Sequence, residues 1–276
     1  MTWRAVVAAL DDHESFRSRV SVYLHPLAGR PIIWHALRSL LDAPVPPLEI
    51  RVLHRSEAPL AVAGLPDVVR FQGVAAGEEA RSLRAAVTAP GMTLLVDGAA
   101  PLLSPGTIAR LLRAGESGVT ALASTPDHLT PLAVAGEGPA LASAEDPRRP
   151  AGVARVTAAV PNELLRVTDR HSLSEAAVAV RDRLVARHEL AGVSFLLPAT
   201  TWVDVDVRIG ADTLIYPSVV LEGVTEIGSE CVIGPYVRIV ESTIGRGAEL
   251  RGWNYVTRTT VRNQAVLEPY TRRGID

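Results

Sequence analysis

The sequence contains no lysine, and all 28 of its basic residues are arginine. Any positive charge that a ligand needs must therefore come from guanidinium groups, which stay protonated and offer several donors to phosphate or carboxylate. The formal net charge is only −2. A chain with so little net charge has no basic field to attract nucleic acid, so we expect no nucleic-acid partner.

Cysteine is almost absent too: Cys231 stands alone, which excludes an internal disulfide and fits a reducing compartment. No apolar run reaches the length of about 18 residues that a membrane span needs. The apolar centre of the first residues is too short for a signal peptide. We therefore expect a cytoplasmic protein with no membrane segment. At 276 residues the chain is long enough for two domains.

Apolar residues recur six residues apart in the last third of the chain. The spacing runs without interruption from Val203 to Ile239, and five-residue steps then precede Ile244 and Val261. A six-residue period fits neither a helix of 3.6 residues per turn nor an alternating strand. It is typical of a hexapeptide parallel β-helix, in which each hexad supplies one short strand and a corner. Since three hexads make one coil, this region predicts about four coils.

A second inner position is expected four residues after each of these apolar residues, in the shortened repeats as well. The predicted inner residues are Val207, Thr213, Val219, Thr225, Cys231, Val237, Thr243, Ala248, Asn254, Thr260, Ala265 and Thr271. Membership of this series favours a small buried side chain at Cys231 over a reactive thiol. Asp204 and Asp206 are predicted to be outward corners rather than a metal-binding pair.

The first 170 residues alternate between strand and helix patterns. Strands are expected at 3–10, 48–53, 67–71, 92–96 and 119–123, and helices at 31–41, 78–87 and 105–114. This alternation predicts a mainly parallel sheet covered on both faces. Residues 132–135 and 141–143 are interpreted as a small hairpin, 154–160 as a strand, and 145–152 as a surface loop.

A helix over 171–192 is predicted to link the two parts of the chain. Ser172 and Glu175 match a capping box at its start, and Gly192 suits its end. The predicted organisation is an α/β domain over 1–170, the linking helix, and a hexapeptide β-helix over 193–276.

Four segments carry motifs shared with one enzyme family. They are LHPLAGRP at 24–31 (LHxLAG[KR]P in the family), LLVDGAAPLLSP at 94–105 (L-x-GDVPLLxP), VTDRHSLSEA at 167–176 (VNDRxQLAEA), and the whole of 191–217. The chain resembles the bifunctional N-acetylglucosamine-1-phosphate uridylyltransferase/glucosamine-1-phosphate acetyltransferase family, and is identified as a degenerate and C-terminally shortened member. The resemblance implies a nucleotidyltransferase-like (Rossmann-like) α/β domain, a left-handed β-helix, and a homotrimer formed through that β-helix.

The family transfers a uridylyl group from UTP to a sugar-1-phosphate. In the family, a glycine-rich loop cradles the triphosphate, an arginine and a lysine carry its charge, and an aspartate and an asparagine hold Mg²⁺. Such chemistry depends mainly on positioning and charge neutralisation. All six matching positions are substituted in this chain: the two glycines by Asp11 and His13, the arginine by Ser15, the lysine by Val22, the aspartate by Ala99 and the asparagine by Thr168.

Four residues are candidates for nucleotide binding in place of the lost groups: Arg17, Arg19, Gly98 and Asp97. Against this possibility, Asp11, Asp12 and Glu14 put carboxylates where phosphates would lie. Two like unit charges about 4 Å apart repel by about 4 kcal/mol at an effective dielectric constant of about 20. Either adaptation to exclude a triphosphate or drift to surface polar residues explains this loop.

The acetyl-transfer half of the family's chemistry is not expected. The family's catalytic histidine and coenzyme A contacts lie on later coils than the closing residues EPYTRRGID. None of the seven histidines has a metal-ligand spacing, and each is predicted to lie at the surface or at a helix cap. Trp253 and Tyr255 fit either an outer face or an oligomer contact.

These features predict a non-catalytic relative of a sugar-1-phosphate uridylyltransferase, serving as a nucleotide-sugar-binding, regulatory or scaffold subunit. Its expected partners are a nucleotide sugar or sugar phosphate, an active partner subunit, and further copies of the chain in a homotrimer. No cofactor is expected. The alternative is an active UDP-N-acetylglucosamine pyrophosphorylase-like sugar-1-phosphate nucleotidyltransferase with a rearranged site, which would need Mg²⁺.

Overall fold

The computed structural model describes all residues except 1, 12–13, 123–131, 151–152, 159 and 275–276. The chain forms two compact units. The first comprises Met1–His25 and Pro31–Ala176, and the second comprises Pro26–Arg30 and Ala177–Asp276. Among the helices of the described residues, none is both long enough and apolar enough to cross a membrane.

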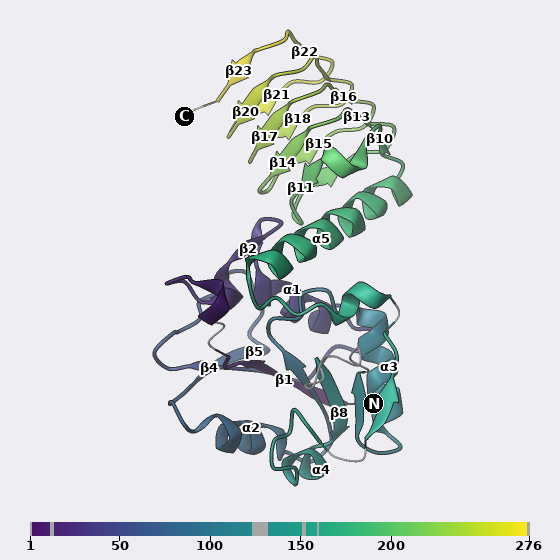
Figure 1. Ribbon diagram of the computed structural model, residues 1–276. Coiled ribbons are helices and arrows are strands. Elements are labelled where there is room, and N and C mark those ends of the chain that lie inside the picture. Colours follow the sequence, from purple (N-terminus) through teal and green to yellow (C-terminus); the bar gives the residue numbers. More distant parts are fainter. Residues whose placement is uncertain (1, 12–13, 123–131, 151–152, 159, 275–276) are drawn as a thin grey trace. The chain divides into compact units, whose positions relative to one another are not determined.

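The first unit is built on a seven-stranded sheet in the order β5-β4-β1-β6-β8-β7-β9 (Figure 1). The strands are β1 (Trp3–Ala9), β4 (Ile50–Arg55), β5 (Val69–Val74), β6 (Met92–Asp97), β7 (Thr120–Leu122), β8 (Ala133–Glu137) and β9 (Ala154–Val156). β1 is parallel to β4 and β6, and β4 is parallel to β5. β8 runs antiparallel to β6 and β7. The predicted mainly parallel sheet is confirmed, with one reversed strand.

Helices cover both faces of this sheet (Figure 1). α1 contacts α3 on one face, and α2 contacts α4 on the other. Val6, Leu53 and Leu95 of the sheet share a buried cluster with Leu83 of α2 and Leu141 of α4. The helical segments of the unit are α1 (Ile32–Leu41), α2 (Glu79–Val87), α3 (Pro105–Gly115), α4 (Gly138–Ala142), and the 3₁₀ turns η1 (Glu14–Phe16), η2 (Val22–Leu24) and η3 (Pro161–Leu164).

The predicted hairpin over 132–143 is wrong. Its second half is the helix α4, whose first turn contains Pro139, a residue that suits a helix start. The first half, β8, pairs along five residues with β6, from Met92 opposite Glu137 to Val96 opposite Ala133. The five-residue pairing of β8 with β6 allows more backbone hydrogen bonds than pairing with a three-residue strand at 141–143 would. The long-range pairing is therefore favoured over the hairpin.

α5 (Arg170–Leu190) is the helix expected to link the two parts, and the boundary between the units falls inside it. The predicted capping box is wrong, because the helix begins two residues before Ser172. Asp169 Oδ1 accepts a hydrogen bond from the Ser172 amide (2.7 Å), whereas Ser172 Oγ accepts from the amides of Thr168 and Asp169 (both 3.0 Å). Asp169 therefore serves as the N-terminal cap.

The second unit contains a parallel β-helix made of three sheets (Figure 1). Two of the sheets have five strands and the third has four, so the stack has nearly five coils. The prediction of about four is slightly low, because the hexad count ran from Val203 to Leu267 and left out β10 (Ser194–Phe195) and β23 (Arg272–Arg273). The strands are β10 (Ser194–Phe195), β11 (Trp202–Val203), β12 (Arg208–Ile209), β13 (Leu214–Ile215), β14 (Val220–Glu222), β15 (Glu226–Ile227), β16 (Val232–Ile233), β17 (Arg238–Val240), β18 (Thr243–Ile244), β19 (Glu249–Leu250), β20 (Tyr255–Thr257), β21 (Thr260–Val261), β22 (Val266–Leu267) and β23 (Arg272–Arg273), with the 3₁₀ turn η4 (Pro198–Thr200) between β10 and β11.

The apolar residue of each hexad points into the β-helix, as the period predicts. Ile215, Ile233, Leu250 and Leu267 lie in register on successive coils, and all belong to one buried cluster. Cys231 is also fully buried within that cluster. Burial raises the pKa of its thiol, which keeps it protonated and unreactive at neutral pH.

The two shortened repeats differ from their predicted form. Thr243 and Thr260 are exposed, whereas Ser242 is buried. In each shortened repeat the residue with left-handed backbone stands only two places after the inward apolar residue, at Glu241 (φ 45°) and Arg258 (φ 45°). The residue that is missing from the hexad is therefore one of the corner. The second inner position lies one residue closer to the inward apolar residue that precedes it, as at Ser242.

A two-stranded hairpin, β2 (Pro26–Leu27) and β3 (Arg30–Pro31), contributes its tip to the second unit. The Ala28 carbonyl accepts a hydrogen bond from the Val205 amide (3.0 Å), and Arg30 pairs with Asp206 (2.6 Å). Gly29 (φ 79°) packs so closely that a Cβ would lie 2.6 Å from Asp204 Oδ2. Only glycine suits both this backbone and this contact.

The prediction that Asp204 is an outward corner is wrong, since the residue is only 7% exposed. Its Oδ2 accepts a hydrogen bond from the Gly223 amide (2.9 Å), and its Oδ1 accepts one from Trp202 Nε1 (3.1 Å). Burial raises the pKa of Asp204 despite these donors. The carboxylate therefore satisfies buried donors between the first coils.

Three histidines predicted at the surface or at caps are buried instead: His35, His54 and His188. His188 of α5 is 5% exposed, and its Nε2 has no hydrogen-bond partner among the described residues. Burial, reinforced by the charge of Arg187, lowers the pKa of His188 to about 4. A neutral imidazole is thus required in the folded state.

We expect the stability of the second unit to fall as the pH drops from about 6.5 towards 4. In that window the unfolded state binds a proton at His188 that the folded state rejects, which costs up to about 3 kcal/mol. Chemical denaturation at several pH values should show this loss in the native chain and a smaller one in His188→Leu. An equal loss in both proteins would contradict the assignment.

Candidate functional site

The carboxyl ends of β1 and β6 form the edge of the sheet where the candidate site lies. These strands are parallel neighbours, with Ala8 opposite Asp97. The chain continues from β1 to β4 on one side and later returns to β6 on the other. Open α/β sheets bind ligands at such a switch point. The Gly98 amide donates to the Ala8 carbonyl (2.8 Å), so the loops that follow both strands begin in contact.

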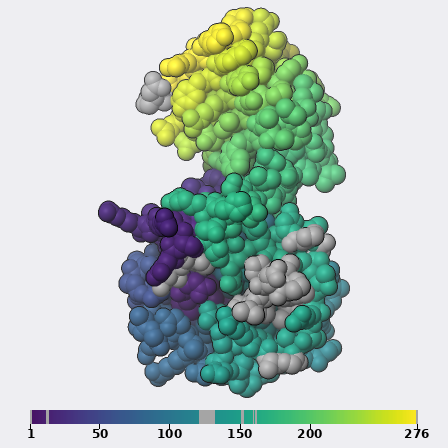
Figure 2. All heavy atoms as spheres, in the orientation of Figure 1, coloured from purple at the N-terminus to yellow at the C-terminus, as the bar shows by residue number. Residues whose placement is uncertain are grey.

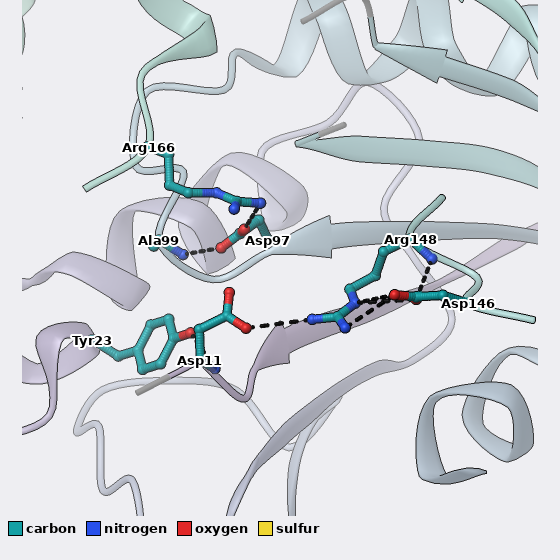
Figure 3. A network of polar contacts seen from close by, with 7 residues as sticks. All are labelled: Asp11, Tyr23, Asp97, Ala99, Asp146, Arg148 and Arg166. Carbon is teal, nitrogen blue, oxygen red and sulfur yellow. Dashed lines mark hydrogen bonds and ion pairs between the residues drawn. The ribbon is translucent and has the colours of Figure 1, made fainter. Parts of the chain in front are cut away.

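Asp97, the last residue of β6, is engaged through both carboxylate oxygens (Figure 3). Its Oδ1 accepts a hydrogen bond from the Ala99 amide (2.8 Å), and its Oδ2 forms an ion pair with Arg166. The residue is only 8% exposed. Because a carboxylate this deeply buried needs its cation, Asp97 is bound within the protein rather than presented to a ligand.

Arg148 joins two further carboxylates beside Asp97 (Figure 3). Its Nε and Nη2 contact the two oxygens of Asp146 (3.1 and 3.0 Å), and its Nη1 lies 3.4 Å from Asp11 Oδ1. Burial opposes the charge on Arg148, but the hydrogen bond and charge of Asp146 outweigh it and raise the pKa of the guanidinium. Burial alone would raise the pKa of Asp146, but the hydrogen bonds and charge of Arg148 outweigh burial and lower it. The pair therefore stays ionised.

Tyr23 of η2 supports the first residue of the loop that follows β1. It is 2% exposed, and its hydroxyl accepts a hydrogen bond from the Asp11 amide (3.2 Å). Burial, followed by the charges of Asp97 and Asp11, raises the pKa of Tyr23 well above its ordinary value. The phenol therefore remains neutral and adds no further negative charge to the site.

The cavity between these groups has a volume of about 10 Å³. It is lined by Ala8, Leu10, Asp11, Leu95, Val96, Asp97, Leu132, Val134, Arg148 and Arg166. That is room for about one water molecule, whereas pockets for organic ligands measure about 300–1,000 Å³. Two internal guanidinium groups thus occupy the switch point of the sheet.

The Mg²⁺ that the family resemblance implies does not fit these residues. Ala99 has no side-chain oxygen, and Asp97 is already paired with Arg166, whose positive charge would repel a divalent cation. Within the described parts of the chain, no three side chains of His, Cys, Asp or Glu gather in a way that could hold a metal ion.

The structure separates the four candidate nucleotide-binding residues. Asp97 lies in the network above, and Gly98 is packed so tightly that a Cβ would lie 3.1 Å from the Ala8 carbonyl oxygen. Arg17 and Arg19 are exposed, and neither lines the cavity at Asp97. Arg19 lines a separate pocket of about 180 Å³.

Most of the substituted family positions have internal contacts. Ser15 Oγ donates to the Thr168 carbonyl (2.7 Å), which joins two of them. Val22 and Ala99 are buried, at 2% and 0% exposure. His13 lies outside the described residues. Ser15, Val22, Ala99 and Thr168 therefore take part in contacts within the unit.

Sequence reasoning missed Tyr23 and the two arginines of the network. The described part of 145–152 is a loop, as expected, but its Arg148 side chain contacts Asp11, 137 residues earlier in the sequence. Arg166 pairs with Asp97 from another distant segment. No local pattern shows which way these arginines point, because their partners are brought near only by the fold.

Comparison with known proteins separates the two parts of the chain. The family model "Bacterial transferase hexapeptide (six repeats)" matches residues 206–241. The protein is 42% identical over 108 residues to the bifunctional protein GlmU of Bacillus velezensis, a match that covers 39% of this chain and 24% of that protein. The GlmU of Mycolicibacterium smegmatis is 44% identical over 84 residues, covering 30% of this chain and 17% of that one. The hexapeptide region is homologous to that of the GlmU proteins.

The matched segments span at most about a quarter of the length of these GlmU relatives. The fold likeness extends further. A nucleotidyl transferase from Methanothermobacter thermautotroptrophicus (Mth528) superposes with a TM-score of 0.53 at 23% identity, covering 67% of this chain and 99% of that chain. A 4-diphosphocytidyl-2C-methyl-D-erythritol synthase gives 0.51 at 13% identity, covering 65% and 99%. The α/β unit therefore has a nucleotidyltransferase-like fold.

Proposed function

We propose that this chain is a non-catalytic relative of the sugar-1-phosphate uridylyltransferases, which binds a nucleotide sugar or sugar phosphate as a regulatory or scaffold subunit. The supporting observation is the pairing of Asp97 with Arg166 at the switch point, beside a cavity of about 10 Å³. A nucleotidyl transfer site needs an open space and cations directed at phosphate. Here the guanidinium groups of Arg148 and Arg166 are directed at the protein's own carboxylates.

The loop after β1 supports the same proposal. Asp11 places a carboxylate where the family binds phosphate, and Tyr23 and Arg148 hold it there. For catalysis, Arg166 and Arg148 would both have to release their carboxylates. The alternative, an active nucleotidyltransferase with a rearranged site, needs that opening together with a metal site that Asp97 alone would have to anchor.

Incubation with UTP, N-acetylglucosamine-1-phosphate and Mg²⁺ tests the proposal, with pyrophosphate release as the readout. We expect no release above the blank, under conditions in which a GlmU protein turns over. Clear turnover that is lost in Asp97→Asn would contradict the proposal and favour the active alternative.

Thermal stability in the presence of UDP-sugars and sugar phosphates separates a binding subunit from a pure scaffold. A ligand at about a hundredfold excess over its Kd stabilises the folded state by about 2.7 kcal/mol. A rise in the melting temperature with one ligand class would identify that class as the bound ligand. No rise with any of them would favour a scaffold subunit that binds no ligand.

We also propose that the chain forms a homotrimer through its β-helix. Tyr236, Trp253 and Tyr270 stack on successive coils, with ring centroids 5.4 and 5.6 Å apart, and remain 57%, 48% and 72% exposed. Exposed Tyr and Trp side chains are enriched at protein interfaces, which favours an oligomer contact for Trp253. Light scattering that finds a monomer at high concentration would contradict the trimer.

A further inference from the structure

A second cavity in the first unit, here called the basic pocket, has a volume of about 180 Å³. It is lined by Ala9, Asp11, Ser18, Arg19, Val20, Ser21, Tyr23, Arg55 and Ala58. It shares only Asp11 with the lining of the small cavity at Asp97. The early purple segment that carries much of this lining stands at the surface of the unit (Figure 2). The basic pocket is thus open to ligands that the small cavity excludes.

The charges around the basic pocket favour an anion. Arg55, at the end of β4, is held by an ion pair between its Nε and Glu57 (2.7 Å), and its side chain is 23% exposed. Arg19 forms no ion pair with any residue that the structure describes. Among the described residues of the lining, Asp11 is the only carboxylate, and it lies 3.4 Å from the guanidinium of Arg148. Arg55 and Asp11 thus each have an internal partner of opposite charge, and Arg19 is the charged residue of the lining that has none among the described residues.

Hydroxyl groups add neutral donors to this lining. Ser18 Oγ accepts a hydrogen bond from the Val20 amide (3.1 Å) and lies 3.0 Å from His25 Nε2, which fixes its position in the loop. Burial, and then the charge of Arg170, lowers the pKa of His25, so this histidine is neutral at physiological pH. Ser21 and the neutral phenol of Tyr23 complete the polar surface.

We propose that the basic pocket binds the phosphate group of a small phosphomonoester. Guanidinium and hydroxyl donors match the oxygens of a phosphate, and arginine does so with several hydrogen bonds at once. The volume lies below the range of about 300–1,000 Å³ that holds whole organic ligands. It therefore suits one phosphate, with the sugar or nucleoside left outside. The inference rests on the proposed binding function and states which group of the ligand is held.

Titration calorimetry tests this proposal on the full chain, in buffer with EDTA and no Mg²⁺. The probes are inorganic phosphate, N-acetylglucosamine-1-phosphate and uridine 5′-monophosphate, with N-acetylglucosamine as the phosphate-free control. We expect the phosphorylated probes to bind and the control not to bind. The tighter of the two organic phosphates identifies the source of the phosphate. Arg19→Gln should weaken binding by about tenfold or more, because a hydrogen-bonded charge pair is lost.

Arg70→Gln is the matched control, since it removes the same charge from an exposed position on β5 that does not line the basic pocket. We expect this variant to bind as the native chain does. Equal weakening in both variants, no binding of any phosphorylated probe, or binding only with Mg²⁺ would overturn the proposal. If UDP-sugars or sugar phosphates raise the thermal stability while Arg19→Gln leaves phosphate binding unchanged, the basic pocket is excluded and the proposed binding function remains.

Discussion

Replacement of Arg166 by leucine is expected to destabilise the first unit by about 3–5 kcal/mol. The guanidinium of Arg166 pairs with Asp97, and Asp97 is only 8% exposed. Without the arginine, the buried carboxylate loses the cation that balances its charge, which hydrogen bonds to neutral donors such as the Ala99 amide do not replace. The loss should appear as a lower midpoint in chemical denaturation followed by circular dichroism.

Two further variants separate the buried charge from the loss of packing. In the double variant Asp97→Asn/Arg166→Leu the carboxylate is gone, so we expect part of the stability to return. Arg155→Leu removes an exposed arginine from β9 and should change the free energy of unfolding by no more than about 0.5 kcal/mol. The single variant Asp97→Asn completes the comparison. If the loss of unfolding free energy in the double variant equals the sum of the losses in the two single variants, Arg166 and Asp97 do not stabilise each other, which would contradict a site closed by their ion pair.

Replacement of Ile233 by alanine is expected to cost about 2–5 kcal/mol in the second unit. Ile233 is fully buried, between Ile215 and Leu250 on the adjacent coils. Coils fixed by backbone ladders on both sides cannot collapse into the space left by the side chain. Most of the cavity should therefore remain, which puts the expected cost in the upper part of that range.

The neighbouring Val232→Ala is the control for this change. Val232 belongs to the same two-residue strand, β16, but points outward and is 37% exposed. We expect its loss to cost much less than that of Ile233, because little apolar surface returns to water. Equal effects of the two substitutions in chemical denaturation would show that inward and outward positions have been assigned wrongly.

The hexad pattern predicted the β-helix well, because its period is local and repeats many times. The same pattern misplaced Thr243 and Thr260, since a missing residue can be absorbed anywhere in a hexad. Left-handed backbone at Glu241 and Arg258 shows that the corner absorbs it. A residue count cannot reveal that choice, because it depends on which turn closes with the least strain.

The candidate site was predicted less completely than the fold. Comparison of motifs predicts that Ala99 and Thr168 replace functional groups of the family, because the absence of a side-chain group is a property of one position. The contacts of Arg166 and Arg148 could not be seen in this way. A guanidinium can face solvent or a carboxylate, and only the long-range strand order brings Asp97 and Asp11 within reach.

The register of the β-helix also determines how the second unit opens. Each strand pairs only with strands of the adjacent coils, 17 to 20 residues away. Such a unit behaves as a one-dimensional array of nearest neighbours, in which local unfolding spreads from coil to coil. The first coil is tied to α5 by Arg181 and Arg187, whereas β21, β22 and β23 have one paired neighbour each among the described strands. Amide protection should therefore decline in steps along the stack, with fraying concentrated in the coils that carry β22 and β23.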